Sequence, residues 1–308
     1  MYDVVVVGGG PAGLSAAVVL GRQRRRVLVV DAGEPRNARA AEMHMYLGRD
    51  GGSPAALLVD GRAEVDAYPT VERRIGRVVS VEGETDGFDV ELVGAGRESA
   101  RRLLLATGQM DTPADVPGLG ERWGTSVFHC PFCHGYETTG KTLAVLGNGV
   151  GAMLAAYVRD RFSDDVVLCT NGPSTLPPPV AELLPARGIS VVETPLTAVE
   201  GELDGLTLRF ADGSSLARDA VYHRAPTHQS ADLAAQLGAE LLPDGCVQVD
   251  EFGRTTVAGV FAAGDSARLA ALPDALTLVG PGAADGVRAA VWLEQELFRS
   301  ELPFTPGG

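Results

Sequence analysis

Two cysteines three residues apart form the most reactive pair that the sequence offers. They lie in the stretch His129-Cys130-Pro131-Phe132-Cys133-His134-Gly135-Tyr136. Cysteines at this spacing can close a small disulfide ring, and a helix that begins there would lower the thiolate pKa and favour electron exchange. A histidine on either side could move the thiol protons. The stretch therefore predicts a redox dithiol at Cys130 and Cys133, with His134 as first candidate base and His129 as second.

Other chemistries fit a C-x-x-C-H pattern taken alone, and they stay open at this point. The pattern also attaches c-type haem, which requires export and a helical context. Zinc requires four ligands, and Cys169 and Cys246 are isolated in the sequence. An inert structural pair is the third alternative. We expect no metal, and we expect Cys169 and Cys246 to be small buried side chains.

A glycine-rich fingerprint lies on each side of the cysteine pair. The first, Gly8-Gly9-Gly10-Pro11-Ala12-Gly13, follows a Val-rich strand at 3–8, and the strand at 27–31 that comes after it ends in Asp31. In such a βαβ unit the glycines let a pyrophosphate approach the backbone, and the acid holds a ribose hydroxyl. The second fingerprint, Gly147 to Ala152, follows a predicted strand at 142–146. A dithiol between two dinucleotide sites indicates an electron relay.

The order of the segments predicts two α/β domains, the second inserted in the first. Strands at 77–82, 88–93 and 99–105 should form an antiparallel excursion, and a final helix is expected at 286–299. Residues 113–124 and 241–245 are predicted to be the outgoing and return linkers. We therefore expect two Rossmann-like, three-layer ββα nucleotide-binding domains, one formed by residues 1–114 and 242–308 and the other by residues 115–241.

Composition limits the partners of the protein. The 308 residues carry a net charge of −14, and clustered Lys and Arg would be needed to bind nucleic acid. No apolar run reaches membrane-spanning length, and no signal-peptide pattern precedes the first strand. Four cysteines are too few for a disulfide scaffold. We expect no nucleic acid, no membrane and a cytoplasmic location.

Together these segments resemble the low-molecular-weight thioredoxin reductases, which are FAD-dependent pyridine nucleotide–disulfide oxidoreductases. The resemblance rests on both fingerprints, the C-x-x-C, Ala106-Thr107-Gly108 and Gly264-Asp265. It implies a non-covalent FAD, a homodimer and a rotating inserted domain, with Cys133 against the flavin and Cys130 exchanging with substrate. The residues that it implies for FAD are Gly8, Gly10, Pro11, Ala12, Gly13, Asp31, Ala32, Asn37, His44, Val78, Ala106, Thr107, Gly108, Gly264, Asp265 and Val279.

The sequence departs from that family in three places. Thioredoxin reductases grip the NADPH 2′-phosphate with an H-R-R-x-x-x-R run, whereas residues 162–186 here contain no Lys or Arg. NADPH binding is therefore doubtful. His134 stands where the family carries Asp, and Thr277-Leu278-Val279 stands roughly where it carries R-Q-A. His44 is also interpretable as a surface or packing histidine.

The C-x-x-C-H motif, with residues 31–37, resembles the thioredoxin-reductase-like dithiol oxidases of secondary metabolism. That resemblance implies an enzyme that forms a disulfide in a small-molecule dithiol and passes the electrons to oxygen, giving hydrogen peroxide. One alternative is a reductase of a thioredoxin-like protein, supplied with electrons by NADPH or ferredoxin. Another is a flavin redox sensor without turnover.

Overall fold

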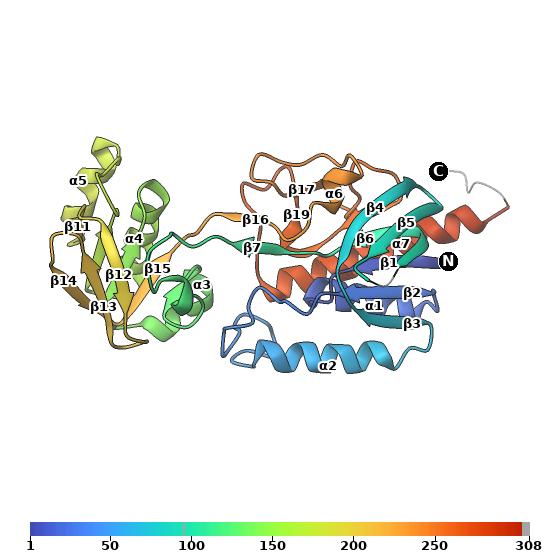
Figure 1. Cartoon of the computed structure of the whole chain (residues 1–308), viewed down its shortest axis with the longest axis horizontal. Helices are drawn as coiled ribbons and strands as arrows, with labels where there is room; N and C mark the ends of the chain where they lie inside the picture. Colours follow the sequence, from blue (N-terminus) through green and yellow to red (C-terminus); the bar gives the residue numbers. More distant parts are fainter. Residues whose placement is uncertain (95, 304–308) are drawn as a thin grey trace. The chain divides into compact units, whose positions relative to one another are not determined.

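The structure is a computed structural model and describes residues 1–94 and 96–303. The chain forms two compact units (Figure 1). Unit 1 contains Met1–Ala38, Met45–Met110 and the chain from His228 onward, and unit 2 contains Arg39–His44 and Asp111–Thr227. The predicted boundaries at 114/115 and 241/242 both lie further along the chain. The chain instead passes between the units near β7 (Gln109–Asp111) and β16 (Thr227–Gln229), two strands that pair with each other.

A sheet with a parallel core organises unit 1. Its strands follow the order β3-β2-β1-β6-β5-β4, and β18 also pairs with β6. The pairs β3–β2, β2–β1, β1–β6 and β6–β18 are parallel, while β4–β5 and β5–β6 are antiparallel. The predicted antiparallel strands are therefore present as β4, β5 and β6. The last of them, β6, also pairs with β1 at the centre of the sheet. The strands are β1 (Tyr2–Val7), β2 (Val27–Asp31), β3 (Val71–Ile75), β4 (Val78–Glu84), β5 (Gly87–Leu92), β6 (Gly96–Leu105) and β18 (Val260–Ala262).

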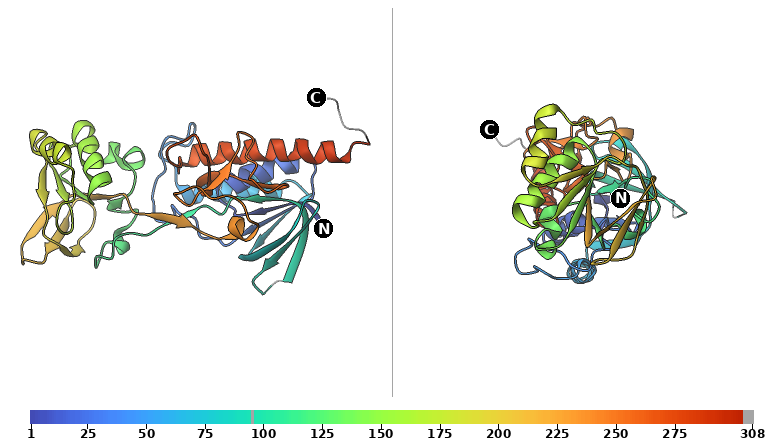
Figure 2. Two further views of the ribbon diagram at one scale, coloured as in Figure 1. Left: turned by 90° about the horizontal axis from the view of Figure 1, so that it is seen from above. Right: turned by 90° about the vertical axis from the view of Figure 1, so that its left-hand side faces the viewer.

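Alternating residues of the central strands bury the two faces of this sheet. Val4 and Val6 of β1 pack with α1 and α7, which lie together on one face (Figure 2). Val5 and Val7 pack on the opposite face with residues of β4, β5, α6 and β17. The remaining elements of unit 1 are α1 (Pro11–Arg22), α2 (Pro54–Asp66), α6 (Leu233–Gln236), β17 (Val247–Val249), η3 (Gly264–Ser266), β19 (Ala267–Leu269) and α7 (Val279–Glu301).

Unit 2 has three layers, as the ββα prediction requires. Its central sheet follows the order β11-β10-β9-β15-β8 with parallel pairing throughout. One face packs against α4 and α5, and the other against the antiparallel sheet β12-β13-β14. The elements are η1 (Gly120–Arg122), β8 (Val127–Phe128), α3 (Pro131–His134), η2 (Tyr136–Thr138), β9 (Leu143–Leu146), α4 (Gly149–Arg161), β10 (Val166–Cys169), α5 (Pro178–Ala186), β11 (Ser190–Val192), β12 (Leu196–Glu200), β13 (Leu206–Phe210), β14 (Ser215–Arg218) and β15 (Ala220–His223).

Two local predictions differ from the structure. The segment predicted as an outgoing linker, 113–124, is part of the core of unit 2, because Val116 and Leu119 are buried there. The final helix begins at Val279 instead of 286, since Pro281 falls in the first turn, where its missing N–H has no partner to lose. None of the described helices combines the length and the apolar character that crossing a bilayer requires.

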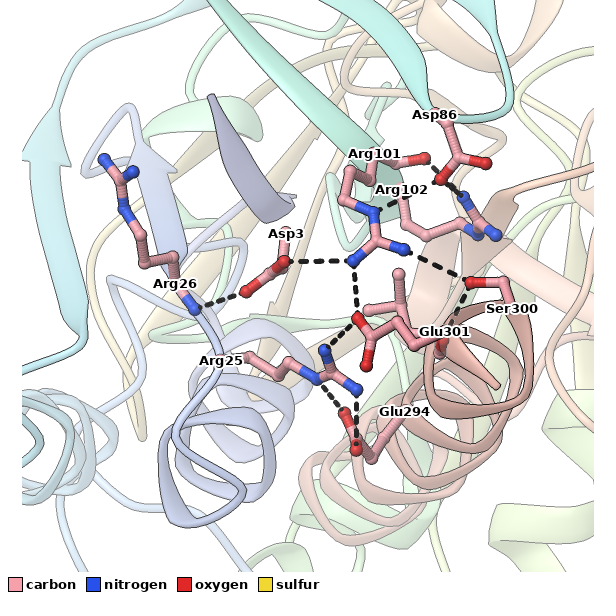
Figure 3. A network of polar contacts seen from close by, with 10 residues as sticks. Asp3, Arg25, Arg26, Asp86, Arg101, Arg102, Glu294, Ser300 and Glu301 are labelled. Carbon is pink, nitrogen blue, oxygen red and sulfur yellow. Dashed lines mark hydrogen bonds and ion pairs between the residues drawn. The ribbon is translucent and has the colours of Figure 1, made fainter. Parts of the chain in front are cut away.

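Ion pairs fasten the end of α7 to the rest of unit 1 (Figure 3). Arg25, which follows α1, binds Glu294 at 2.5 Å and Glu301 at 2.6 Å. Arg101 of β6 binds the same Glu301 at 2.6 Å and Asp3 of β1 at 3.3 Å. The network therefore joins four segments that are distant in the sequence.

Candidate active site

The carboxyl ends of four parallel strands bring the predicted FAD segments together in unit 1. The first fingerprint follows β1, Asp31 ends β2, Ala106-Thr107-Gly108 follows β6, and Gly264-Asp265 follows β18 by one residue. Parallel strands end at the same edge of a sheet, which is where α/β sheets bind nucleotides. One edge of the sheet thus presents all four segments.

The glycines of the first fingerprint fit a nucleotide for different reasons. A Cβ on Gly8 would lie 2.1 Å from the carbonyl oxygen of Ala106, and one on Gly13 would lie 1.9 Å from that of Gly8. These two glycines are therefore required by close packing of the backbone. A Cβ on Gly10 would meet no atom within 4 Å. Gly10 thus leaves open backbone at the start of α1, where a pyrophosphate can approach.

Most of the residues implied for FAD lie in unit 1, and one does not. Asp265 pairs with Arg36 at 3.0 Å in the loop region after β2. His44 belongs to unit 2, where its Nε2 lies 3.5 Å from Glu137 Oε1 and 3.7 Å from Glu42 Oε2. Its assignment to FAD stays a prediction. Those in unit 1 are Gly8, Gly10, Pro11, Ala12, Gly13, Asp31, Ala32, Asn37, Val78, Ala106, Thr107, Gly108, Gly264, Asp265 and Val279.

The cysteine pair begins α3 in unit 2. Cys130 is the N-cap residue and Pro131 takes the first helical position, for which its fixed φ is suited. Hydrogen bonding to the Cys133 side chain, together with the backbone N–H groups of Cys133 and Phe132 and the charge of Arg224, lowers the pKa of Cys130 to about 7. Both cysteines are thiols in the structure. Cys130 is therefore prepared as a nucleophilic thiolate near neutral pH.

The position of Arg224 follows from the sheet order. Arg224 comes directly after β15, which pairs in parallel with β8, the strand that leads into the cysteine motif. The two strands end at the same edge, so the guanidinium lies near Cys130 although the two residues are far apart in the sequence. Sequence reasoning missed Arg224, because no local pattern reveals which strands are neighbours.

His134 is held against an aromatic ring. Its imidazole stacks on Phe128 of β8, with ring centroids 4.2 Å apart and an interplanar angle of 15°. Burial lowers the pKa of His134 to about 4, so the ring is neutral at pH 7. A pKa this low makes the imidazole a weak base for a thiol proton. Among the described residues, its buried Nδ1 has no hydrogen-bond partner.

His129 occupies a different environment on the other side of Cys130. Its Nδ1 lies 3.9 Å from Asp111 Oδ1, and its ring meets Trp123 edge-on at 6.1 Å. The structure thus places both histidines beside the cysteine pair, one stacked and neutral, the other near an acid. Catalytic roles for Cys130, Cys133, His134 and His129 stay predictions.

The second fingerprint forms a strand–turn–helix. The loop after β10, residues 170–175, is hydrogen-bonded to Asn148 of this fingerprint and within itself. Asn148 donates from Nδ2 to the Thr170 carbonyl at 3.3 Å, and its Oδ1 accepts from the Thr175 N–H at 2.9 Å. Thr170 Oγ1 donates to the Gly172 carbonyl at 2.7 Å. Of the arginines that flank this stretch, Arg159 pairs with Asp164 and Arg187 with Asp160, while the guanidinium of Arg161 lies over the Tyr157 ring, 5.9 Å from its centroid.

The two remaining cysteines are buried, as predicted. Cys169 is 0% exposed and Cys246 is 1% exposed. Burial raises the pKa of Cys169 to about 12 and also raises that of Cys246. Neither thiol has the character of a redox nucleophile.

Comparison with known proteins identifies the family. The model of the pyridine nucleotide-disulphide oxidoreductases matches residues 2–287. The chain is 35% identical to "Thioredoxin reductase tcpT" of Claviceps purpurea, over 90% of each chain, and 34% identical to "Thioredoxin reductase sirT" of Leptosphaeria maculans, over 87% of each. The crystal structure of HlmI superimposes with a TM-score of 0.88 at 41% identity, covering 96% of this chain and 92% of that one.

These matches confirm the predicted fold class and resemblance, and with them the FAD cofactor. They span nearly the whole chain, including both fingerprints and the cysteine pair. The chain therefore belongs to the pyridine nucleotide-disulphide oxidoreductases and is a thioredoxin-reductase-like, FAD-dependent thiol-disulfide oxidoreductase.

Proposed function

We propose that this enzyme is a dithiol oxidase, which closes a disulfide in a small-molecule dithiol and delivers the electrons to molecular oxygen. The observation that carries the proposal is made at the second fingerprint: the described residues 162–186 beside it contain no Lys or Arg, and Asn148 hydrogen-bonds to the Thr170 carbonyl and the Thr175 N–H. A nucleotide 2′-phosphate needs Arg or Lys partners.

We also expect a homodimer. Light scattering of the 32.0 kDa chain tests this expectation.

The exchange step uses the two cysteines in their oxidised form. A substrate thiolate attacks Cys130 of the Cys130–Cys133 disulfide, and Cys133 leaves as a thiolate. The second substrate thiolate then attacks the substrate sulfur bound to Cys130, which releases Cys130 and the product disulfide. The substrate loses two electrons and two protons, and the cysteine pair gains the electrons. Bound FAD would supply the acceptor for that electron pair, and oxygen would receive it to form hydrogen peroxide.

We expect His134 to act as a transient proton acceptor in this exchange, because a pKa of about 4 makes its imidazolium release a proton readily. It directly follows Cys133, and its imidazole is neutral at pH 7 and can accept a thiol proton. Arg224 favours the thiolate of Cys130 as leaving group. A leaving thiol of lower pKa departs faster, so the same charge that activates Cys130 speeds release of the product.

The second candidate is an NADPH-dependent reductase of thioredoxin or a similar protein. The names of the relatives favour it, because tcpT and sirT are both called thioredoxin reductases. The two candidates share the cysteine chemistry and differ in the direction of electron flow. They are therefore separated by the source of the electrons.

Turnover of the FAD-loaded enzyme with dithiothreitol in air tests the proposal. We expect oxygen uptake with equal amounts of oxidised dithiothreitol and hydrogen peroxide, together with little bleaching of the flavin by NADPH under anaerobic conditions. Cys130→Ser and Cys133→Ser should abolish turnover, whereas Cys169→Ala, at a buried thiol, should retain it. Rapid flavin bleaching by micromolar NADPH without oxygen-dependent turnover would favour the reductase instead.

A further inference from the structure

A proton that His134 accepts must afterwards be transferred to solvent. The imidazole is covered on one face by Phe128, and burial disfavours its charged form. Each dithiol that is oxidised releases two protons, so a base of this kind must be discharged in every cycle. The groups around the imidazole must therefore be able to accept this proton.

The segment from Pro131 to Thr138 follows a continuous helical path. Gly135, between α3 and η2, has φ −66° and ψ −40°, and the Thr138 N–H donates to the Gly135 carbonyl at 3.2 Å. Residues three apart on such a path face the same side, with Cβ atoms about 5–6 Å apart. Glu137 is three residues after His134 and is therefore the nearest acid along this segment.

Glu137 in turn meets a histidine from a distant part of the sequence. His44 Nε2 lies 3.5 Å from Glu137 Oε1, and Glu42 Oε2 lies 3.7 Å from the same nitrogen. The exposed fraction of the side chain is 38% for Glu137, 17% for His44 and 58% for Glu42, so the two acids reach water and His44 lies between them. All of these residues belong to unit 2. The row leads from the buried imidazole to water.

We propose that Glu137 and His44 carry the proton from His134 to solvent during dithiol oxidation. The step moves a proton and no electron: the substrate S–H bond breaks, the imidazole binds the proton, and Glu137 accepts it and passes it to His44 or directly to water. The inference rests on the proposed function for His134 as base. The titratable groups around His134 are Cys130, Cys133, Glu137, His44 and, behind Phe128, Tyr222.

Anaerobic reduction of the bound flavin by dithiothreitol, followed by stopped flow, tests this route. The half-reaction needs neither oxygen nor NADPH, so it reports on proton removal even if oxygen is not the natural acceptor. We expect Glu137→Gln to slow it roughly tenfold to a hundredfold, less than loss of a direct acid–base group. Imidazole buffer should restore most of the rate. His44→Gln should show a smaller loss and the same rescue.

Two controls separate a proton route from a structural effect. Glu182→Gln removes an exposed acid of α5 in the same unit and should leave the rate unchanged. Alkylation of Cys130 by iodoacetamide should proceed normally in Glu137→Gln, which shows that the cysteine site is intact. A Glu137→Gln rate equal to that of Glu182→Gln at low buffer, or a loss that imidazole does not repair, would overturn the proposal. Failure of oxygen uptake alone would overturn only the oxidase.

Discussion

At the scale of single residues, the reactivity of Cys130 is the most direct consequence of its surroundings. With a pKa of about 7, roughly half of its thiol is ionised at neutral pH. We predict that iodoacetamide alkylation of the reduced protein, followed by mass spectrometry, has its midpoint near pH 7. Arg224→Gln removes a positive charge and should move the midpoint upward. Cys169 serves as internal control, since burial should keep it unmodified; a Cys130 midpoint near 9 would contradict the assignment.

The ring of Phe128 should govern the protonation of His134. Phe128→Leu removes the stacked face and admits water, so we predict that the pKa of His134 rises from about 4 toward 6.5. Titration of the imidazole proton signals by NMR, assigned with His134→Asn, measures this change. The free energy of unfolding should fall by about 1–2 kcal/mol. Phe210→Leu, at an equally buried ring of β13, should cost similar stability without moving the His134 titration.

At the scale of elements, the two fingerprints offer a matched pair of substitutions. A Cβ meets no atom within 4 Å at Gly10 or at Gly149, the corresponding glycine of the second fingerprint. Both Gly→Ala variants should therefore fold. We predict that Gly10→Ala weakens FAD binding by about tenfold or more, because the methyl occupies the approach of the pyrophosphate. Flavin absorbance after gel filtration measures the loss.

For an oxidase that uses no second nucleotide, we expect Gly149→Ala to have no effect. Its flavin content and its turnover of dithiothreitol with oxygen should equal those of the parent enzyme. A Gly149→Ala variant that keeps FAD but loses turnover would instead indicate that the second fingerprint holds a nucleotide during catalysis.

The sequence predicts an element well when the contacts that form it lie between residues close together in the chain. The strand, glycine turn and acid of the first βαβ unit follow one another in the chain, and they form as predicted. The segment 113–124 is rich in Pro and Gly and is therefore predicted to be a linker. Its residues Val116 and Leu119 are nevertheless buried in the core of unit 2. Such burial depends on the core of a domain formed by residues much later in the chain.

The same limit applies to the site. Cys130, Cys133 and His134 were predictable because the motif is contiguous, and their helix start is encoded by Pro131. The pairing of His44 with Glu137 was not, because a short excursion of the chain, Arg39–His44, belongs to the other unit. Only the helical spacing of three between His134 and Glu137 could have drawn attention to the acid.

At the scale of the whole molecule, charge acts on stability in two opposing ways. The net charge of −14 at pH 7 opposes the compact state, and this repulsion weakens as the pH falls toward the pI of about 4.8. Ion pairs at the end of α7 act in the other direction. Hydrogen bonds from Arg25 and then Arg101 hold the pKa of Glu301 below its usual value of 4.5. A carboxyl with a lowered pKa stabilises the fold above the usual value and loses that contribution as the pH falls through the lowered one.

Comparing two variants of equal charge separates these effects. Glu301→Gln removes one negative charge and the network contact, whereas Glu251→Gln removes one negative charge from an exposed turn of the same unit. We predict that Glu301→Gln is less stable than Glu251→Gln above pH 5, by about 1 kcal/mol or less because Glu301 is 38% exposed. The difference should shrink below pH 4, where Glu301 of the control becomes protonated. Urea unfolding of both variants between pH 3 and 7 measures it, and a difference that stays constant with pH would show that the network contributes packing instead of charge.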